Sequence, residues 1–370
     1  MKNIKLFLLL IALCVLLSTT IIPVYSAAGI LYETERNHYT GVADRTYDDY
    51  DNYGAITSYD DQDFWVISFE EEGMANFWLG NIPEGCNYDL IISEYDTVQK
   101  YARTNQIGNA DEMLRLHVKP DTNYYIRVYS HYCHYSDSMY KLRVNWYPLK
   151  DAKYFGSNIS SINTLDSITI GSAVMGYLWD MNFPGYPPYP DNTANSVLNS
   201  MANTEVMTIY NHAGAGCITL PTNPYSTPIM TNLYAGTNNS MTSYDRAIST
   251  IPNSSINMSL LVFCGCNSGV TDANGYNLVD EAIKKGAFSS IGWKNTIRIS
   301  YANTWLSAFY EHCAEGYTVY DAALEADQVI TSVYSRNSGY SDYYREIINR
   351  YYGSTRATEN AKGTVLDLCE

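Results

Sequence analysis

The chain carries little positive charge, and its composition first excludes the protein classes that depend on a basic surface. Lys and Arg together number 23 against 39 Asp and Glu, which gives a formal net charge of −16 at pH 7. Binding to a nucleic-acid backbone needs a basic surface, so no nucleic-acid partner is expected. None of the eight cysteines forms a CxxC pair, which argues against a zinc framework.

Long apolar runs are also lacking beyond the first residues. The run Leu6–Leu17 follows Lys2 and Lys5, and polar residues and Pro23 interrupt it before it reaches the length of a membrane span. This pattern is typical of a signal peptide over residues 1–26, with an uncleaved membrane anchor as the alternative. We therefore predict an exported, extracellular protein with no membrane span after signal removal.

Seven cysteines remain after the signal, and an odd number leaves at least one thiol unpaired. Cys86 and Cys133 share the first half of the chain and are candidates for one disulfide. The other five lie in the second half, where a free reactive thiol is expected; they are Cys217, Cys264, Cys266, Cys313 and Cys369.

Residues 28–150 show the pattern of an all-β module. Short runs of alternating apolar and polar residues are separated by turn-rich pieces; they are 64–69, 75–80, 88–95, 114–118, 124–130 and 140–146. Period-two alternation at this spacing predicts an antiparallel β-sandwich.

The motifs of this region resemble those of the bacterial pre-peptidase C-terminal (PPC) domain. The matching stretches are Glu33-x-x-x-Asn37, Gly54–Ile56, Asp60–Trp65, Tyr88–Leu90, Tyr124–Val128 and Tyr140–Leu142. The resemblance implies a jelly-roll-like sandwich of a bacterial secreted protein. It also implies a role in secretion or in attachment to a substrate or cell surface rather than in catalysis.

An acidic cluster in this module offers oxygen ligands for Ca²⁺. Its members are Asp48, Asp49, Asp51, Asp60, Asp61 and Asp63. Ca²⁺ takes six to eight hard oxygen ligands, yet the spacing of a dedicated calcium loop is missing. A solvated acidic loop is the alternative, and we favour it.

After a linker and entry to the second domain over residues 151–172, the range 173–370 alternates helical and strand patterns. The expected helices are 192–202, 244–251, 276–285, 301–315 and 319–334, and the expected strands are 205–210, 259–263 and 287–292, with a candidate first strand ending at Asp180. Fully apolar strands alternating with helices predict an α/β domain with a mainly parallel sheet flanked by helices.

Two of these strands end in reactive residues. The strand 205–210 runs into His212, and the strand 259–263 runs into Cys264-Gly265-Cys266. If the strands are neighbours, an imidazole and a thiol meet at the carboxyl edge of the sheet, where function gathers in such folds. Side chains alternate along a strand, so Cys264 and Cys266 face the same way, with Cys266 nearer the edge. Cys266 is therefore the candidate nucleophile and His212 its base.

The order of these residues resembles that of the caspase-like cysteine peptidases, closest to the CHAT and gingipain-like branch. The motifs are a strand ending in His212, a strand ending in Cys266-x-Ser268-Gly269, and Gly286–Trp293. The resemblance implies a caspase-like fold with Cys266 as nucleophile and His212 as general acid/base. It further implies an oxyanion hole from the backbone of Cys266 and of Ala213 or Gly214, and a pocket wall from Trp293.

Two departures leave alternatives open. Ala213 stands where the family has glycine, and a second register puts Ala215 on the family's histidine, which makes the chain a pseudoenzyme. The family's carboxylate at the floor of the substrate pocket has no direct match, and Asp180 and Asp272 are the nearest candidates.

The sequence thus predicts a secreted cysteine endopeptidase that hydrolyses protein or peptide substrates through a Cys266–His212 dyad. No cofactor is required in this hypothesis, and Ca²⁺ is a candidate ion only. The N-terminal module provides a candidate attachment to the cell surface. The alternative is a catalytically inactive secreted binding protein built on a degenerate caspase-like domain.

Overall fold

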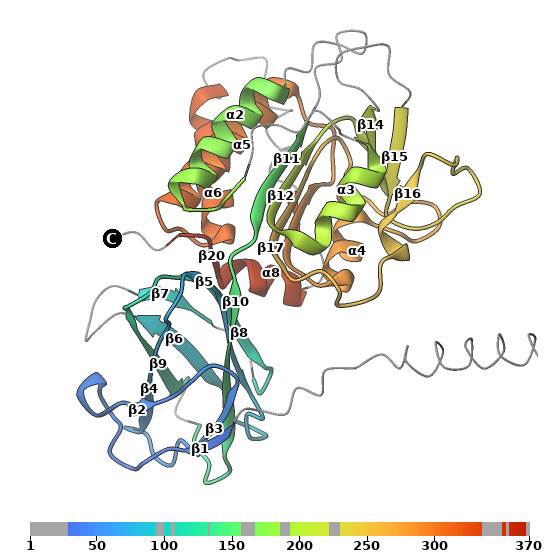
Figure 1. Ribbon diagram of the computed structural model, residues 1–370. Helices are drawn as coiled ribbons and strands as arrows, with labels where there is room; N and C mark the ends of the chain where they lie inside the picture. The colour runs from blue at the N-terminus through green and yellow to red at the C-terminus, as the bar shows by residue number, and fades with distance from the viewer. Residues whose placement is uncertain are drawn as a thin grey trace, which may run out of the picture.

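The computed structural model describes residues 29–93, 100–104, 108–131, 134–156, 167–185, 193–221, 230–334, 350–352 and 355–367, and Figure 1 shows their arrangement. The predicted signal peptide and the predicted partner Cys133 of Cys86 lie outside these ranges. Among the residues described, no helix has both the length and the apolar character to cross a membrane.

The N-terminal module, residues 29–148, is built mainly of strands. Its elements are β1 (Gly29–Tyr32), η1 (Thr40–Val42), β2 (Asp44–Arg45), β3 (Tyr50–Gly54), β4 (Gln62–Ser68), β5 (Gly73–Gly80), β6 (Tyr88–Ser93), β7 (Lys100–Arg103), β8 (Glu112–Val118), β9 (Asn123–Ser130) and β10 (Tyr140–Pro148). They form one sheet in the order β1-β3-β10-β5-β8, which β20 extends, and another in the order β2-β4-β9-β6-β7. Every second residue of both sheets, such as Phe77 and Leu79 or Trp65 and Ile67, enters one shared core.

The second module, residues 151–367, mixes helices and strands. It contains β11 (Asp151–Gly156), α2 (Ser167–Asp180), α3 (Ala194–Ser200), η3 (Met201–Asn203), β12 (Thr204–Tyr210), β13 (Ala213–Gly214), β14 (Cys217–Pro221), β15 (Met230–Tyr234), β16 (Arg246–Ala247), η4 (Ile248–Thr250), β17 (Met258–Cys264), α4 (Leu278–Lys285), β18 (Ala287–Trp293), α5 (Ile299–Ala314), α6 (Val319–Tyr334), β19 (Arg350–Tyr351), α8 (Thr355–Lys362) and β20 (Thr364–Val365).

A central sheet in the order β11-β12-β17-β18-β19 organises this module. Its first four strands run parallel, and β19 is antiparallel to β18. Side chains of α2, α5 and α6 fill the core on one face, and those of α3 and α4 fill the core on the other (Figure 1). The expected parallel sheet covered on both faces is therefore present.

Residues 151–156, in the predicted linker and entry to the second domain, form strand β11, because the chain enters the sheet directly after β10. Two expectations for this module were wrong. The segment ending at Asp180 is helix α2 and not a strand, since its buried residues Val174, Met175 and Leu178 have helical spacing against α5. The expected helix 244–251 is the short strand β16 followed by the 3₁₀ turn η4.

A buried ion pair joins the two modules. Arg115 on β8 is 1% exposed, and its guanidinium lies 2.7 Å from Glu205 Oε1 at the start of β12. It also donates to Ser259 Oγ (2.6 Å), Asn257 Oδ1 (2.9 Å) and Asn76 Oδ1 (2.9 Å), and Ser259 Oγ donates to Glu205. These partners satisfy the guanidinium in a site without solvent.

The C-terminal segment strengthens the same junction. Strand β20 pairs in parallel with β8, so Thr364 lies beside Arg115 and Val365 beside Leu116 (Figure 1). Val365 thereby enters the core of the N-terminal module. The second module thus contributes a strand to a sheet of the first, which the expected boundary near residue 150 did not foresee.

We predict that Arg115→Met destabilises the protein by about 3–5 kcal/mol, because the change leaves the Glu205 charge buried and unpaired. Urea unfolding followed by intrinsic fluorescence measures the change in the free energy of unfolding. The control is Arg143→Met, which leaves the Asp51 carboxylate paired with Lys141 (2.7 Å), so a smaller loss than that of Arg115→Met is expected there. Equal losses in the two variants would contradict the role given to Arg115.

A second buried cluster lies inside the N-terminal module. The Tyr140 hydroxyl donates to Asp63 Oδ2 (2.7 Å) and accepts from Trp65 Nε1 (3.0 Å), and Glu33 accepts from the Ala55 amide (2.6 Å). Burial, followed by the hydrogen bond and negative charge of Glu33, raises the pKa of Asp63 to about 9. The buried Asp63–Glu33 pair therefore retains a proton in the folded protein at neutral pH.

This raised pKa predicts that stability falls as pH rises. The ordinary value of 3.8 applies to the unfolded chain, so unfolding releases a proton between that pH and about pH 9. The stabilisation is complete below the unfolded pKa, and it decreases by up to about 1.4 kcal/mol per pH unit above it. Unfolding curves from about pH 5 to about pH 8 should show a flatter dependence for Asp63→Asn, whereas the exposed control Asp60→Asn should keep the wild-type slope.

Candidate active site

The two strands that carry the candidate residues are direct neighbours. β12 and β17 pair in parallel, with Tyr210 beside Cys264 at the end of the ladder. The Asn211 amide then donates to the Cys264 carbonyl (3.1 Å). His212 and Cys266 each follow this last pair by two residues, so both leave the sheet at the same carboxyl edge.

Gly265 allows the two strand ends to touch. A Cβ at this position would lie 2.5 Å from the Asn211 carbonyl oxygen and 2.6 Å from the Ala213 Cβ, closer than real atoms approach. The backbone on either side of His212 therefore packs against the backbone that carries Cys266, and only glycine permits this approach.

The turn of residues 265–270, which we name the thiol turn, is held by buried hydrogen bonds. Ser268 Oγ donates to the Phe263 carbonyl (2.6 Å) and accepts from the Trp293 amide (3.1 Å). The Asn277 side chain donates to the Gly269 carbonyl (2.7 Å) and caps helix α4 by accepting from the Val279 amide (2.8 Å). The thiol turn is thus anchored to β18 on one side and to the start of α4 on the other.

The thiol of Cys266 is half-buried and contacts the backbone of Ile297, in the segment between β18 and α5. Its Sγ lies 3.5 Å from the Ile297 nitrogen and 3.6 Å from the Ile297 oxygen. The neighbouring Asn267 amide donates to the Asn295 carbonyl (3.0 Å), which fixes this segment beside the thiol turn. No sequence signal pointed to Ile297, because the contact arises only when β17 and β18 pair.

Cys264, the other cysteine of the strand end, lies in the core. It is fully buried, and burial, with a smaller contribution from Cys266, raises the pKa of its thiol well above the ordinary value. A buried thiol of raised pKa is a poor nucleophile. The structure therefore agrees with the interpretation of Cys264 as a packing residue.

His212 occupies the first residues of a hairpin that leaves the sheet. Its amide donates to Asn211 Oδ1 (2.8 Å), and its carbonyl accepts from the Thr219 amide (2.8 Å). The hairpin pairs β13 with β14, and its tight turn uses Gly216 at φ +69°. Ala215, the position that carries the histidine in the alternative register, is exposed in this turn and farther along the chain from the end of β12.

The candidate oxyanion donors differ in their surroundings. Ala213 starts β13 and lies against Gly265, close to the thiol turn. Burial raises the pKa of the Cys217 thiol, and a hydrogen bond from the Gly214 backbone acts in the opposite direction. Because the Gly214 amide interacts with Cys217, the backbone amides of Ala213 and Cys266 are the better placed pair.

Of the three candidate pocket residues, one lies near the site. Asp272 Oδ1 accepts from the Asn274 and Tyr276 amides (2.8 Å each), and its side chain packs against Gly216 in the hairpin that follows His212. Asp272 therefore shapes a turn beside the candidate site.

The other two candidates, Trp293 and Asp180, lie away from the site, which corrects the prediction that they line the substrate pocket. Trp293 is fully buried and packs edge-to-face on Trp305 at 5.1 Å between ring centroids, so it belongs to the core beneath the helices. Asp180 is exposed at the end of α2. The residues that follow α2 approach the N-terminal module, where Asn182 donates to Glu72, at the end of the sheet opposite His212.

The six acidic residues proposed for Ca²⁺ do not converge. Asp51 pairs with Lys141 and Arg143, while Asp48 accepts from the Trp146 amide. Asp61 accepts from Thr57, and Asp63 accepts from the Tyr140 hydroxyl. Within the described ranges, no group of three or more acidic, histidine or cysteine side chains is arranged to hold a metal ion.

Comparison with known proteins finds only distant likenesses. No family model and no curated protein matches the chain. Similar solved structures include a pre-peptidase C-terminal domain of a collagenase from Bacillus anthracis (18% identity, 28% of this chain and 94% of that chain, TM-score 0.23). They also include the Arg-specific cysteine proteinase gingipain R (11% identity, 59% of this chain and 45% of that chain, TM-score 0.38).

A third similar structure is PliG of Aeromonas hydrophila, a periplasmic inhibitor of g-type lysozyme (13% identity, 32% of this chain and 100% of that chain, TM-score 0.21). All three TM-scores lie below 0.5, so these likenesses carry no argument about fold or activity. The assignment of chemistry depends on the geometry of the site.

We predict that Gly265→Ala slows alkylation of Cys266 by iodoacetamide by about tenfold or more, because the added methyl group separates the His212 and Cys266 strand ends. The matched control is Gly214→Ala, where a Cβ meets no atom within 4 Å, and its rate should equal the wild-type rate. Mass spectrometry of the labelled peptide measures both rates. A wild-type rate for Gly265→Ala would show that the close approach has no influence on the thiol.

Proposed function

We propose that this protein is a secreted cysteine endopeptidase with Cys266 as nucleophile and His212 as general acid/base. The observation that carries the proposal is the parallel pairing of Tyr210 with Cys264, from which both residues extend by the same two positions. A thiol and an imidazole on adjacent strand ends, with backbone amides beside them, are the groups that acyl transfer needs.

The proposed reaction proceeds in two stages. His212 takes the proton of the Cys266 thiol, and the thiolate attacks the carbonyl carbon of the scissile peptide bond. The amides of Ala213 and Cys266 stabilise the oxyanion, a contribution on the order of 3 kcal/mol per donor. Protonated His212 then gives its proton to the leaving amine, and an acyl-cysteine remains.

Water completes the cycle. His212 removes a proton from the water molecule as its oxygen attacks the acyl-cysteine, and collapse of the second tetrahedral intermediate releases the carboxylic acid product. The returning proton restores the Cys266 thiol, so one peptide bond is hydrolysed and no external oxidant, reductant or cofactor is consumed.

We further propose that the N-terminal module is of the pre-peptidase C-terminal kind and the second module caspase-like, and that export removes residues 1–26. The supporting observations are the two sheets that share one core in the first module and the helix-covered parallel sheet in the second.

The alternative is a non-catalytic binding protein. The contact of the Cys266 sulfur with both backbone groups of Ile297 favours it, since this contact gives the thiol partners that do not require His212. In the peptidase, His212 makes the Cys266 thiol reactive. In the binding protein, the reactivity of Cys266 does not depend on His212.

We predict that Cys266→Ala abolishes hydrolysis of an unstructured protein such as casein and that His212→Ala reduces it by at least about 100-fold, as loss of a general base does. Iodoacetamide at neutral pH should label wild-type Cys266 stoichiometrically and the His212→Ala variant slowly. The control is Cys217→Ala, which removes the half-buried thiol of the neighbouring hairpin and should retain full activity. Hydrolysis by purified Cys266→Ala would overturn the proposal.

A further inference from the structure

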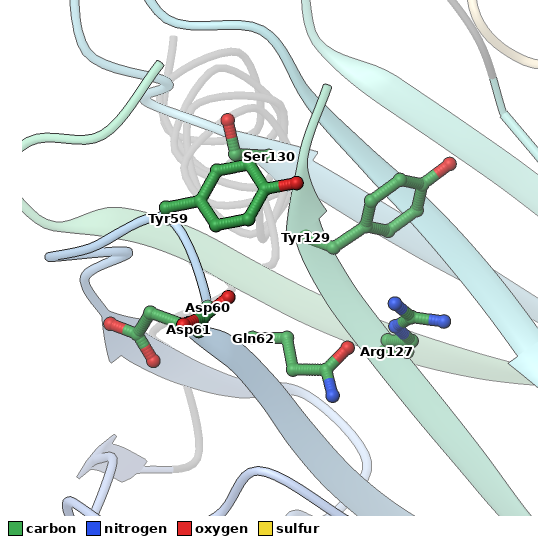
Figure 2. A pocket seen from close by; sticks show the side chains of 7 residues that line it. All are labelled: Tyr59, Asp60, Asp61, Gln62, Arg127, Tyr129 and Ser130. Carbon is green, nitrogen blue, oxygen red and sulfur yellow. The ribbon is translucent and has the colours of Figure 1, made fainter. Parts of the chain in front are cut away.

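A polar pocket opens on the N-terminal module, apart from the candidate active site. Its volume is about 450 Å³, within the range of roughly 300–1,000 Å³ that small-molecule sites occupy. We name it the Tyr59 pocket, and it is lined by Tyr59, Asp60, Asp61, Gln62, Arg127, Tyr129 and Ser130 (Figure 2).

Strand register assembles the floor of the Tyr59 pocket. β4 and β9 pair antiparallel with Gln62 opposite Tyr129 and Phe64 opposite Arg127, so these side chains share one face of the sheet. The loop before β4 supplies Tyr59, whose ring stands beside that of Tyr129 above Gln62 and Arg127 in Figure 2. Tyr59 is 69% exposed, so its ring is accessible to a ligand in the pocket.

The polar groups of the pocket are held in place by neighbours. The Tyr129 hydroxyl donates to Asp89 (2.9 Å), and the Arg127 guanidinium lies 4.9 Å from the Tyr129 ring centroid and 6.0 Å from that of Phe64. The side-chain nitrogen of Gln62 donates to the His38 carbonyl (3.0 Å). This hydrogen bond orients the side-chain oxygen of Gln62 as a hydrogen-bond acceptor. A pocket fixed in this way binds without a large ordering cost.

The pocket carries charges of both signs. Arg127 contributes one positive charge and Asp60 an exposed carboxylate at the other end, while the Asp61 carboxylate accepts from Thr57 (Figure 2). A neutral ligand with both donors and acceptors can donate to Asp60 and accept from Arg127.

The sheet itself excludes a peptide bound as an added strand. β9 pairs along its length with β4 and β6. The other side of β4 is paired with β2 at Trp65 and Val66, and the Phe64 amide donates to the Asn37 carbonyl. Strand addition requires an exposed edge. Recognition in the Tyr59 pocket must therefore come from side chains.

We propose that the Tyr59 pocket binds a short neutral oligosaccharide. The apolar face of a sugar ring stacks on the Tyr59 ring, while its hydroxyl groups donate to Asp60 and to the Gln62 oxygen and accept from Arg127. The binding does not require peptidase activity. In the secreted protein, oligosaccharide binding in the Tyr59 pocket holds the candidate active site close to surfaces that carry glycans.

The test uses the full-length Cys266→Ala protein, so that binding is measured without hydrolysis. An array of neutral, acidic and basic oligosaccharides is screened first, and titration calorimetry with chitotriose, cellotriose and maltotriose follows. We expect saturable binding of at least one neutral oligosaccharide. Tyr59→Ala should weaken this binding by about tenfold, the worth of one stacked ring, and Tyr59→Phe should retain it.

The matched control is Tyr244→Ala, which removes a tyrosine of similar exposure (58%) from the second module and should leave the affinity unchanged. Binding of charged oligosaccharides or peptides alone, or of no neutral oligosaccharide on the array, would overturn the proposal. Neutral binding that Tyr59→Ala and Tyr244→Ala weaken equally would also overturn it, because the ligand would then lie outside the Tyr59 pocket. None of these results depends on whether Cys266 is a nucleophile.

Discussion

The parallel ladder between β12 and β17 ends with Tyr210 beside Cys264, and the candidate site of the second module depends on this register. A slip of one residue would turn every side chain of one strand to the opposite face. Because both strands are buried on both faces, helices α2, α5 and α6 on one side and α3 and α4 on the other fix the register by packing. The close contact at Gly265 then brings the two strand ends together.

The same strands connect the site to the N-terminal module at their other ends. Glu205 begins β12 and Ser259 lies at the start of β17, and both bind the buried guanidinium of Arg115. Strand β20 adds a second link by pairing with β8. The two modules therefore share hydrogen-bonded structure, and the N-terminal module is joined to the central sheet at the end opposite His212 and Cys266.

Local sequence patterns predicted nine of the strands and four of the helices. The six alternating runs of the N-terminal module are strands, and the apolar strands 205–210, 259–263 and 287–292 are β12, β17 and β18. The errors fall where local pattern is ambiguous. The segment ending at Asp180 is apolar enough for a strand, and only its packing against α5 makes it a helix. Trp293 is aromatic and ends β18, the strand that pairs with β17, yet burial against Trp305 removes it from any pocket.

By itself, the sequence determined the two-module composition, the period of each element and the pair His212 and Cys266 at two strand ends, because these follow from local periodicity and spacing. Tertiary structure alone decided that Ile297 contacts the Cys266 sulfur, that Arg115 joins the modules and that Gln62, Arg127 and Tyr129 share one pocket. Each of these contacts joins residues that are distant in sequence. Strand pairing determines such contacts, and local sequence patterns do not predict which strands pair.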